Sequence, residues 1–190
     1  DGIGYIRITE FDSVTYDQFA SALEDLEAQG MTGLVIDLRD NPGGNLDTVC
    51  DILDLILPEG TIVSTKDKNG EGETYTSDEE HKLEIPLSVL TNGNSASASE
   101  IFAGAVQDYG VGTLVGTTTF GKGIVQQIFP LTDGTSIKLT ISEYFTPKGR
   151  NIHGTGIDPD VEVEYEYNEE DPAADNQLEK AIEIVKGNGM

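Results

Sequence analysis

Basic residues are scarce in this sequence, and their scarcity excludes several classes of partner. Lysine and arginine together number 11 against 35 aspartate and glutamate residues, a formal net charge of −24. A field of this sign repels nucleic-acid phosphates and the head groups of anionic lipids. We therefore expect no nucleic-acid partner and no membrane contact from this segment.

Cysteine is nearly absent and long apolar runs are missing. The sequence has a single cysteine, Cys50, so no disulfide framework can form within it, and its apolar neighbours predict a small buried side chain. No run approaches the ~18 apolar residues of a membrane span. No cationic start leads into an apolar, signal-like segment. If the intact protein is exported, we expect its address to lie outside these residues.

The motifs of metal and nucleotide sites are also missing. The two histidines, His81 and His153, belong to no H-E-x-x-H arrangement and have no cysteine partner. The glycines complete neither the P-loop spacing nor G-x-G-x-x-G. We therefore expect no metal and no cofactor.

The hydrophobic pattern predicts alternating strands and helices. Two short, mainly apolar runs, 34–38 and 87–90, are typical of strands covered on both faces. Two strands around Asp133-Gly134 predict a long hairpin, with Ile137, Leu139, Ile141 and Glu143 on one face. The predicted strands are 3–11, 34–38, 61–65, 73–77, 87–90, 111–115, 124–130 and 135–145, and the predicted helices are 15–29, 46–57, 97–109 and 175–186. With 37% apolar residues, residues 1–190 are expected to form one mixed α/β domain.

Ser97 is the candidate nucleophile. It lies where a turn gives way to a helix, and free N–H groups at a helix start favour a developing negative charge. The sequence Ser97-x-x-Glu100 also matches a capping box, so the hydroxyl can instead serve only as a helix cap. On local sequence alone, the cap is the favoured interpretation.

Lys122 is the candidate base, because a serine hydroxyl needs a neighbouring group to take its proton. It lies between two glycines directly before an apolar strand, and a lysine can accept a proton only where desolvation favours the neutral amine. Gln126, four residues later, would share its face on an extended segment and can hold the amine. The alternatives are an exposed turn lysine, a glutamine that fixes a neighbouring strand, and His153 as a rival base.

Residues 37–44 (DLRDNPGG) follow a buried strand, where functional loops of α/β proteins usually lie. The glycines permit close backbone approach, so the Gly43 N–H can face a reacting carbonyl oxygen. The alternative is an ordinary strand-to-helix turn with a surface pair of Asp37 and Arg39.

Taken together, these motifs resemble those of the carboxyl-terminal processing, or tail-specific, proteases over nearly the whole chain. The shared motifs lie in the same order as in that family, at 4–8 (GYIRI), 37–44 (DLRDNPGG), 95–101 (SASASEI), 119–126 (TFGKGIVQ) and 156–161 (GIDPDV). The resemblance implies a serine endopeptidase that cleaves protein substrates near accessible carboxyl-terminal tails. It also implies an extracytoplasmic location.

The resemblance assigns roles to five residues. It implies Ser97 as nucleophile, Lys122 as base and Gln126 as the residue that orients the lysine, with an oxyanion hole from the backbone N–H groups of Gly43 and Ala98. It further implies a core of crotonase or Clp-protease type, built from β-β-α units with an added long β-hairpin.

Two expectations qualify this interpretation. Family members normally carry a PDZ domain, cap segments and a signal or anchor, so we expect a catalytic domain that begins just after the PDZ domain of a longer protein. The rival functions are a non-catalytic peptide- or ligand-binding module on the same fold and a crotonase-type acyl transferase acting on thioesters. The anionic coenzyme that such a transferase needs would meet a strongly acidic surface.

Overall fold

A parallel sheet of five strands forms the centre of the molecule. The computed structural model describes residues 2–78 and 80–187. The strands, in spatial order, are β1 (Ile3–Arg7), β2 (Gly33–Asp37), β5 (Leu87–Thr91), β6 (Thr113–Gly116) and β9 (Val161–Glu162). All four pairings are parallel, and every residue of β2 and β5 is buried. The prediction that these two strands are covered on both faces is therefore confirmed.

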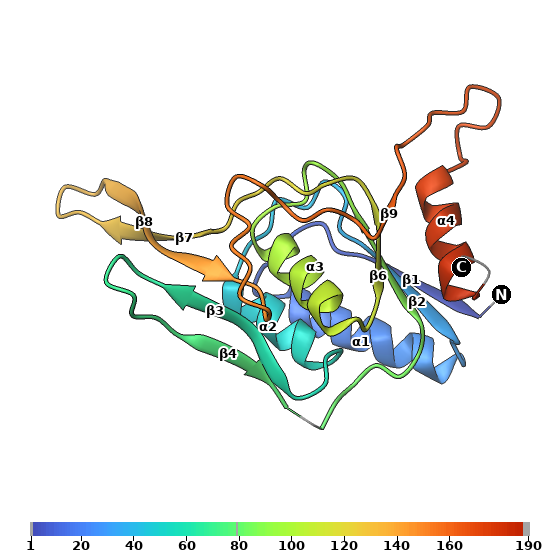
Figure 1. Ribbon diagram of the computed structural model, residues 1–190, viewed down its shortest axis with the longest axis horizontal. Coiled ribbons are helices and arrows are strands. Elements are labelled where there is room, and N and C mark those ends of the chain that lie inside the picture. The colour runs from blue at the N-terminus through green and yellow to red at the C-terminus, as the bar shows by residue number, and fades with distance from the viewer. Residues whose placement is uncertain (1, 79, 188–190) are drawn as a thin grey trace.

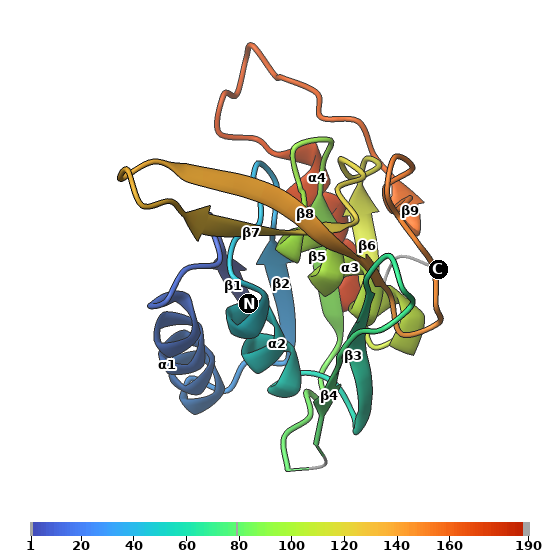
Figure 2. The same cartoon turned by 90° about the vertical axis from the view of Figure 1, so that its left-hand side faces the viewer.

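Four helices cover the sheet (Figures 1 and 2). Helices α1 (Thr15–Ala28), α2 (Leu46–Asp54) and α3 (Ala98–Tyr109) share a core with Leu34 and Ile36 of β2. The intervening Val35 belongs to a separate cluster with α4 (Asn176–Val185). Because successive side chains of a strand point to opposite faces, α4 covers the face opposite α1–α3. None of these helices is both long and apolar enough to cross a membrane.

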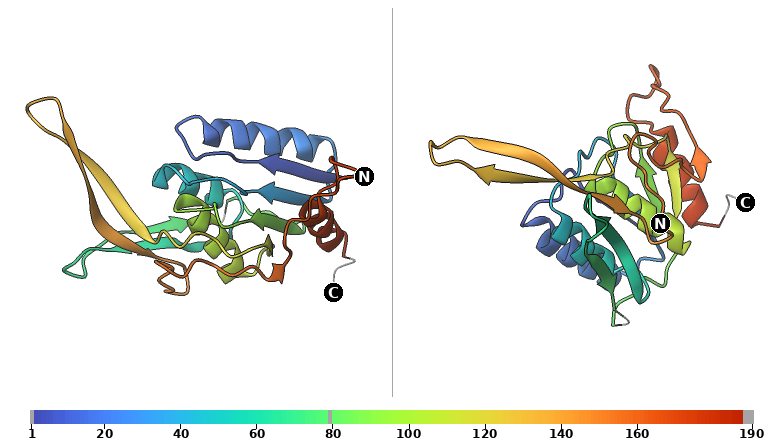
Figure 3. Two further views of the ribbon diagram at one scale, coloured as in Figure 1. Left: turned by 90° about the horizontal axis from the view of Figure 1, so that it is seen from above. Right: turned by 60° about the vertical axis from the view of Figure 1, so that its left-hand side comes forward.

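A second, antiparallel sheet lies beyond the helices. Its strands are β3 (Gly60–Lys66), β4 (Thr74–Ser77), β7 (Ile124–Pro130) and β8 (Ser136–Phe145), in the order β4-β3-β8-β7. The β7–β8 hairpin extends away from the body of the molecule (Figure 3). Several large apolar side chains toward its tip, including Ile128, Leu139 and Ile141, are exposed.

Several predicted boundaries are wrong. The first strand ends at Arg7 rather than Phe11, because its partner β2 ends at Asp37 and the chain then turns to bury Phe11. Helix α2 ends three residues early, at Asp54, and the short strand β9 has no counterpart in the prediction. In the hairpin, Val125 pairs with Ser142 but Gln126 pairs with Thr140, so a bulge interrupts the regular alternation predicted for β8.

Candidate active site

Three loops meet at the carboxyl edge of the parallel sheet. They are residues 38–45 after β2, 92–97 after β5 and 117–123 after β6. Ser95 joins the first two by donating its hydroxyl to the Leu38 carbonyl at 2.8 Å. The Ser95 carbonyl accepts from the Phe120 N–H at 3.0 Å and so joins the third. This edge is where open α/β sheets usually carry their functional residues, and it brings the predicted motifs together.

Ser97 has a strained backbone at the start of α3. Its φ is +57° with ψ −114°, and Asp40 is the only other non-glycine residue with positive φ in the described part of the chain. Such conformations persist where surrounding contacts impose them, and they concentrate at functional sites. Here the buried Tyr144 hydroxyl donates to the Ser97 carbonyl at 3.0 Å.

The predicted capping box is present in outline. The Glu100 carboxylate accepts from the Ser97 N–H, as that motif requires. The Ser97 side chain faces the Glu100 N–H, the other half of that motif, and the same N–H donates to the Ser97 main-chain carbonyl at 2.9 Å. The cap therefore fixes the backbone of Ser97 through the Glu100 carboxylate.

Glu100 is the residue that joins the two candidate catalytic segments. It is fully buried, and its Oε2 accepts from both the Ser97 N–H and the Lys122 N–H at 2.8 Å. Its Oε1 accepts from the Thr119 hydroxyl at 2.6 Å and the Gly121 N–H at 2.7 Å. Four donors and the positive end of the α3 dipole compensate for the buried charge. The backbone nitrogens of Ser97 and Lys122 thus lie within two hydrogen-bond lengths of each other.

Lys122 is partly buried, and the flanking glycines are required by packing. A Cβ on Gly123 would lie 2.7 Å from the His153 nitrogen, and one on Gly121 would lie 3.0 Å from the Gly156 nitrogen. The loop with His153 therefore packs against the lysine loop, although the His153 side chain is exposed. No carboxylate of the described residues lies within 4.0 Å of the Lys122 amine, and no hydrogen bond joins that amine to the Ser97 hydroxyl.

The Gln126 side chain makes its hydrogen bond away from Lys122. Lys122 precedes β7, whereas Gln126 lies within the strand, next to the bulge. The Gln126 side chain is exposed and donates from Nε2 to the Thr140 hydroxyl at 3.4 Å. In this conformation the amide is engaged across the hairpin and does not contact the candidate base.

The two predicted oxyanion donors are neighbours with different environments. A Cβ on Gly43 would lie 2.9 Å from the Ala98 nitrogen and 2.8 Å from the Ser97 Cβ. The Ala98 N–H is the first of the helix, and no acceptor for it exists in the described part of the chain. The Gly43 N–H, by contrast, donates to the buried Asn41 side chain at 2.8 Å.

Asp37 and Arg39 do form the predicted pair, but not on the surface. The Asp37 side chain is 1% exposed, accepts from Arg39 Nε at 2.9 Å and also accepts from the Tyr5 hydroxyl at 2.8 Å. Arg39 Nη1 reaches Asp175 and Gln177, both at 3.0 Å, at the start of α4. The prediction of a surface pair is wrong because α4 covers this end of β2.

The charges of this network shift the acidities of its members. Burial alone would raise the pKa of Asp175, but hydrogen bonds from Arg39 and Leu178 outweigh burial and hold that pKa below its usual value. Burial, together with the Asp37 carboxylate, raises the pKa of Tyr5 to about 12. The α4 helix is therefore attached to the loop that carries Gly43 through an ion pair that is ionised at neutral pH.

Asp40 braces the same loop from the other side. Its carboxylate accepts from the Asn94 side chain at 2.8 Å and the Asn92 side chain at 3.0 Å, and these bonds lower its pKa. Its N–H donates to the Asn92 side chain at 3.0 Å. The bonds hold Asp40 at its positive φ and lock the glycine loop to the loop that leads into Ser97.

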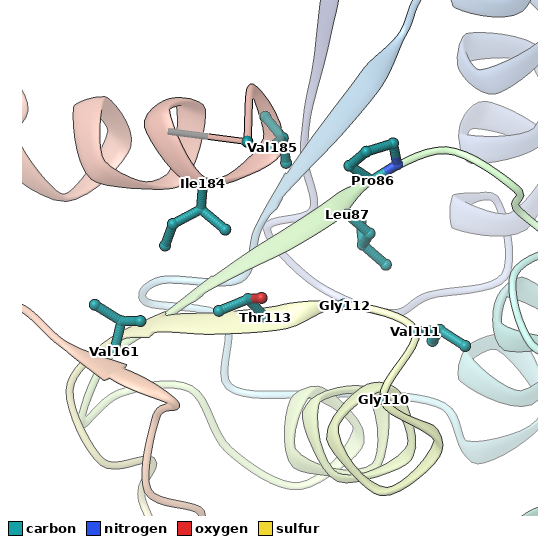
Figure 4. A pocket seen from close by; sticks show the side chains of 10 residues that line it. Pro86, Leu87, Gly110, Val111, Gly112, Thr113, Val161, Ile184 and Val185 are labelled. Atoms are coloured by element: carbon teal, nitrogen blue, oxygen red, sulfur yellow. The ribbon is translucent and has the colours of Figure 1, made fainter. Parts of the chain in front are cut away.

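Two other features lie away from this edge. Asp78, Glu80 and His81 place ligand atoms within 4.8 Å of one another on an exposed loop, an arrangement common on acidic surfaces without a metal. An apolar cavity of about 370 Å³ lies between the end of α4 and the amino ends of β5 and β6 (Figure 4). Since the candidate site lies at the carboxyl ends of those strands, this cavity is not part of it.

Comparison with known proteins relates the chain to one family. The model of peptidase family S41 matches residues 2–163. A carboxyl-terminal-processing protease of Synechocystis sp. is 45% identical over 188 residues, which cover 97% of this chain and 44% of that protein. The carboxy-terminal processing protease CtpB of Bacillus subtilis is 44% identical over 162 residues, covering 85% of this chain and 34% of that protein.

A solved structure gives the same result. The photosystem II D1 C-terminal processing protease matches with a TM-score of 0.81 and 34% identity, over 99% of this chain and 47% of that chain. The present chain thus spans less than half the length of each of these relatives.

Proposed function

Because the chain belongs to peptidase family S41, we propose that it is the catalytic part of a serine endopeptidase that cleaves protein substrates near their carboxyl termini. The observation that carries the proposal is that Glu100 Oε2 accepts two hydrogen bonds, one from the Ser97 N–H and one from the Lys122 N–H. These bonds hold the two backbones together. A serine nucleophile and a lysine base must lie on adjacent segments, and this contact supplies that adjacency.

In the proposed reaction, the Ser97 hydroxyl oxygen attacks the scissile carbonyl carbon while the neutral Lys122 amine takes the hydroxyl proton. The carbonyl oxygen becomes an oxyanion, which the Ala98 and Gly43 N–H groups stabilise. The tetrahedral intermediate then collapses, and Lys122 returns its proton to the departing amine. Water, deprotonated by the same lysine, then attacks the acyl carbon. The bond from that carbon to the Ser97 oxygen breaks, the lysine returns its proton to this oxygen, and the acyl group leaves as a carboxylic acid. Within residues 2–78 and 80–187 no ion pair occupies the Lys122 amine, which supports this role.

The described conformation requires three rearrangements for turnover. The Gly43 N–H must leave the Asn41 side chain to face an oxyanion, and the Lys122 amine must come within hydrogen-bond reach of the Ser97 hydroxyl. Gln126 would orient the amine only after it leaves Thr140. We propose that bound substrate favours these changes, as in enzymes whose catalytic geometry is completed on binding.

The experiment compares three alanine variants, at Ser97, Lys122 and His153. Cleavage of an unstructured peptide and labelling by a serine-directed fluorophosphonate are measured for each. We expect Ser97→Ala to abolish both signals and Lys122→Ala to lower both by at least ~100-fold, since general-base catalysis contributes ~10²–10⁴-fold. His153→Ala tests the neighbouring rival base and should retain turnover. Unchanged cleavage in Ser97→Ala or Lys122→Ala refutes the assignment.

A second candidate is a peptide-binding module without catalysis. It is favoured by one specific observation, the engagement of the Gly43 N–H by Asn41, which leaves only one oxyanion donor open. If a peptide binds while the fluorophosphonate fails to label Ser97 under all conditions, this second function is correct.

The wider setting is part of the same proposal. Residues 1–190 would form one catalytic domain with a crotonase- or Clp-protease-like core, and the full-length protein would add a PDZ domain and act outside the cytoplasm. The parallel sheet with helices on both faces supports the core assignment. One relative, from Tetradesmus obliquus and 36% identical over 165 residues, is named a chloroplastic C-terminal processing peptidase.

A further inference from the structure

A groove of about 440 Å³ lies in the fork between the two antiparallel hairpins. Strands β3 and β8 pair from Ser64 with Phe145 to Lys66 with Glu143, and beyond that point the β3–β4 turn and the β7–β8 hairpin separate (Figures 1 and 3). Glu71 and Glu73 line one side of the fork, and Ile141 lines the other. The volume suits a few side chains rather than a folded partner.

Two lining residues of the groove lie close in sequence to residues of the candidate active site. Leu46, in its wall, follows Gly43 by three residues, and Val125, in the wall as well, follows Lys122 by three. Three residues span at most ~11 Å even when extended. A peptide held with its carbonyl at Ser97 therefore has neighbouring side chains within reach of the groove.

The lining combines apolar surface with negative charge. Leu46, Tyr75 and Val125 pack on the core yet remain partly exposed, and Ile141 is 39% exposed. The Tyr75 hydroxyl donates to the Glu73 carboxylate at 3.1 Å. Burial, with that hydrogen bond and charge, raises the pKa of Tyr75 to about 12.

Among the residues that the structure describes, no cationic side chain lines this groove, so no lining cation pairs with its carboxylates. The lining residues are Leu46, Thr65, Glu71, Gly72, Glu73, Tyr75, Val125, Ile141 and Ser142. Neither Glu71 nor Glu73 takes part in an ion pair in the described part of the chain. A long basic side chain matches such a site, because its methylene stem packs on apolar surface while its charged head reaches the carboxylates.

We propose that this groove is a specificity site that selects a lysine or arginine side chain close to the scissile bond, with Glu71 and Glu73 as the residues that recognise it. The inference rests on the proposed peptidase function and names a substrate class for it, polypeptides with a basic residue near the cleaved bond. The net charge of −24 adds a long-range attraction for such segments.

The test uses internally quenched peptides that differ at one position near the cleaved bond, which carries lysine, norleucine or glutamate. Norleucine keeps the unbranched stem and removes the charge. At the position whose side chain occupies the groove, we expect lysine to exceed norleucine in kcat/KM by about 1.5–5-fold, the range for exposed charge pairs, with glutamate lowest. The preference should fall as salt is raised.

Matched variants locate the preference. Glu73→Gln and Glu71→Gln should each reduce the lysine advantage, whereas Glu143→Gln should preserve it. Glu143 carries the same charge on β8 but lines a neighbouring cavity instead of this groove. Equal loss in Glu143→Gln would mean a general field effect and would overturn the proposal.

Binding to the Ser97→Ala protein separates this inference from the proposed function. Fluorescence anisotropy of the labelled peptides gives their Kd values without turnover. We expect the lysine peptide to bind more tightly than the norleucine peptide by the same factor as in kcat/KM. If the peptides bind or are cleaved with no preference for lysine, the groove proposal is wrong while the peptidase assignment stands. The same holds if a lysine preference exists but neither Glu71→Gln nor Glu73→Gln reduces it. Cleavage that persists in Ser97→Ala overturns the assignment instead.

Discussion

Replacement of Gly43 by alanine tests the proposed oxyanion donors through a steric change of known position. Gly43 has φ +103°, and an added Cβ would lie 2.6 Å from the Ala96 carbonyl oxygen, 2.8 Å from the Ser97 Cβ and 2.9 Å from the Ala98 nitrogen. Real Cβ contacts of this length are almost unknown, and the contacted atoms belong mainly to the backbone. Either the glycine loop or the start of α3 must therefore move.

The expected magnitude has a stability part and an activity part. A non-glycine residue at this φ costs ~1–3 kcal/mol in backbone strain. Forcing a methyl group into filled space costs a further ~1–3 kcal/mol. Each kcal/mol lowers the Tm of a chain of this size by ~2–4 °C. The methyl group would also stand over the Ala98 N–H, and loss of one oxyanion donor lowers kcat by ~10²–10³-fold.

Gly149 supplies a matched control for Gly43. Its φ is +78°, and nothing lies within 4 Å of the Cβ that alanine would add. Gly149→Ala should therefore incur only the backbone strain of ~1–3 kcal/mol and retain the activity of the parent protein. Peptide-cleavage kinetics and thermal unfolding of both variants give the comparison. A folded Gly43→Ala protein with kcat within about threefold of Gly149→Ala would refute the oxyanion assignment.

Two further predictions concern residues that brace the site. Tyr144→Phe removes the hydrogen bond to the Ser97 carbonyl, so urea titration should show a loss of ~0.5–1.5 kcal/mol in unfolding free energy. Peptide-cleavage kinetics should show a larger change in kcat than in KM. An unaltered kcat would contradict a positioning role for Tyr144. Because the pKa of Asp175 is lowered in the fold, its stabilising effect is full above the usual aspartate pKa and is lost as pH falls through the folded value. The stability difference between the parent and Asp175→Asn should thus be constant near pH 7 and shrink below about pH 4. Val185→Ala, a buried α4 change away from Arg39, should show no such pH dependence, and a pH-independent gap for Asp175→Asn would argue against the ion pair.

Sequence patterns predicted the type and order of nearly all elements, because the local apolar period differs between strands and helices. The mainly apolar run at 34–38 predicted a strand covered on both faces, and β2 is entirely buried. Element ends were less predictable. The end of β1 depends on where β2 stops, and the end of α2 depends on its packing against β3 and β4. A short window of sequence contains neither kind of contact.

Within the site, the sequence predicted which segments matter but not how they connect. The spacing Ser97-x-x-Glu100 indicated a helix capping box, and that cap exists. Nothing local indicated that the other contacts of Glu100 come from Thr119, Gly121 and Lys122, more than fifteen residues later. The attachment of Arg39 to Asp175 was equally hidden, since the two residues are separated by 136 positions.

The amino-acid sequence by itself determined the acidic character of the chain, its alternation of strands and helices, and the motifs that carry a serine, a lysine and close-approach glycines. Tertiary structure alone decided which of these groups meet. Parallel strands gather their following loops at one edge, so residues distant in sequence become neighbours only when the sheet forms. The strained Ser97 backbone and its link to the lysine loop depend on long-range hydrogen bonds from Tyr144 and to Glu100, which no short segment of sequence specifies.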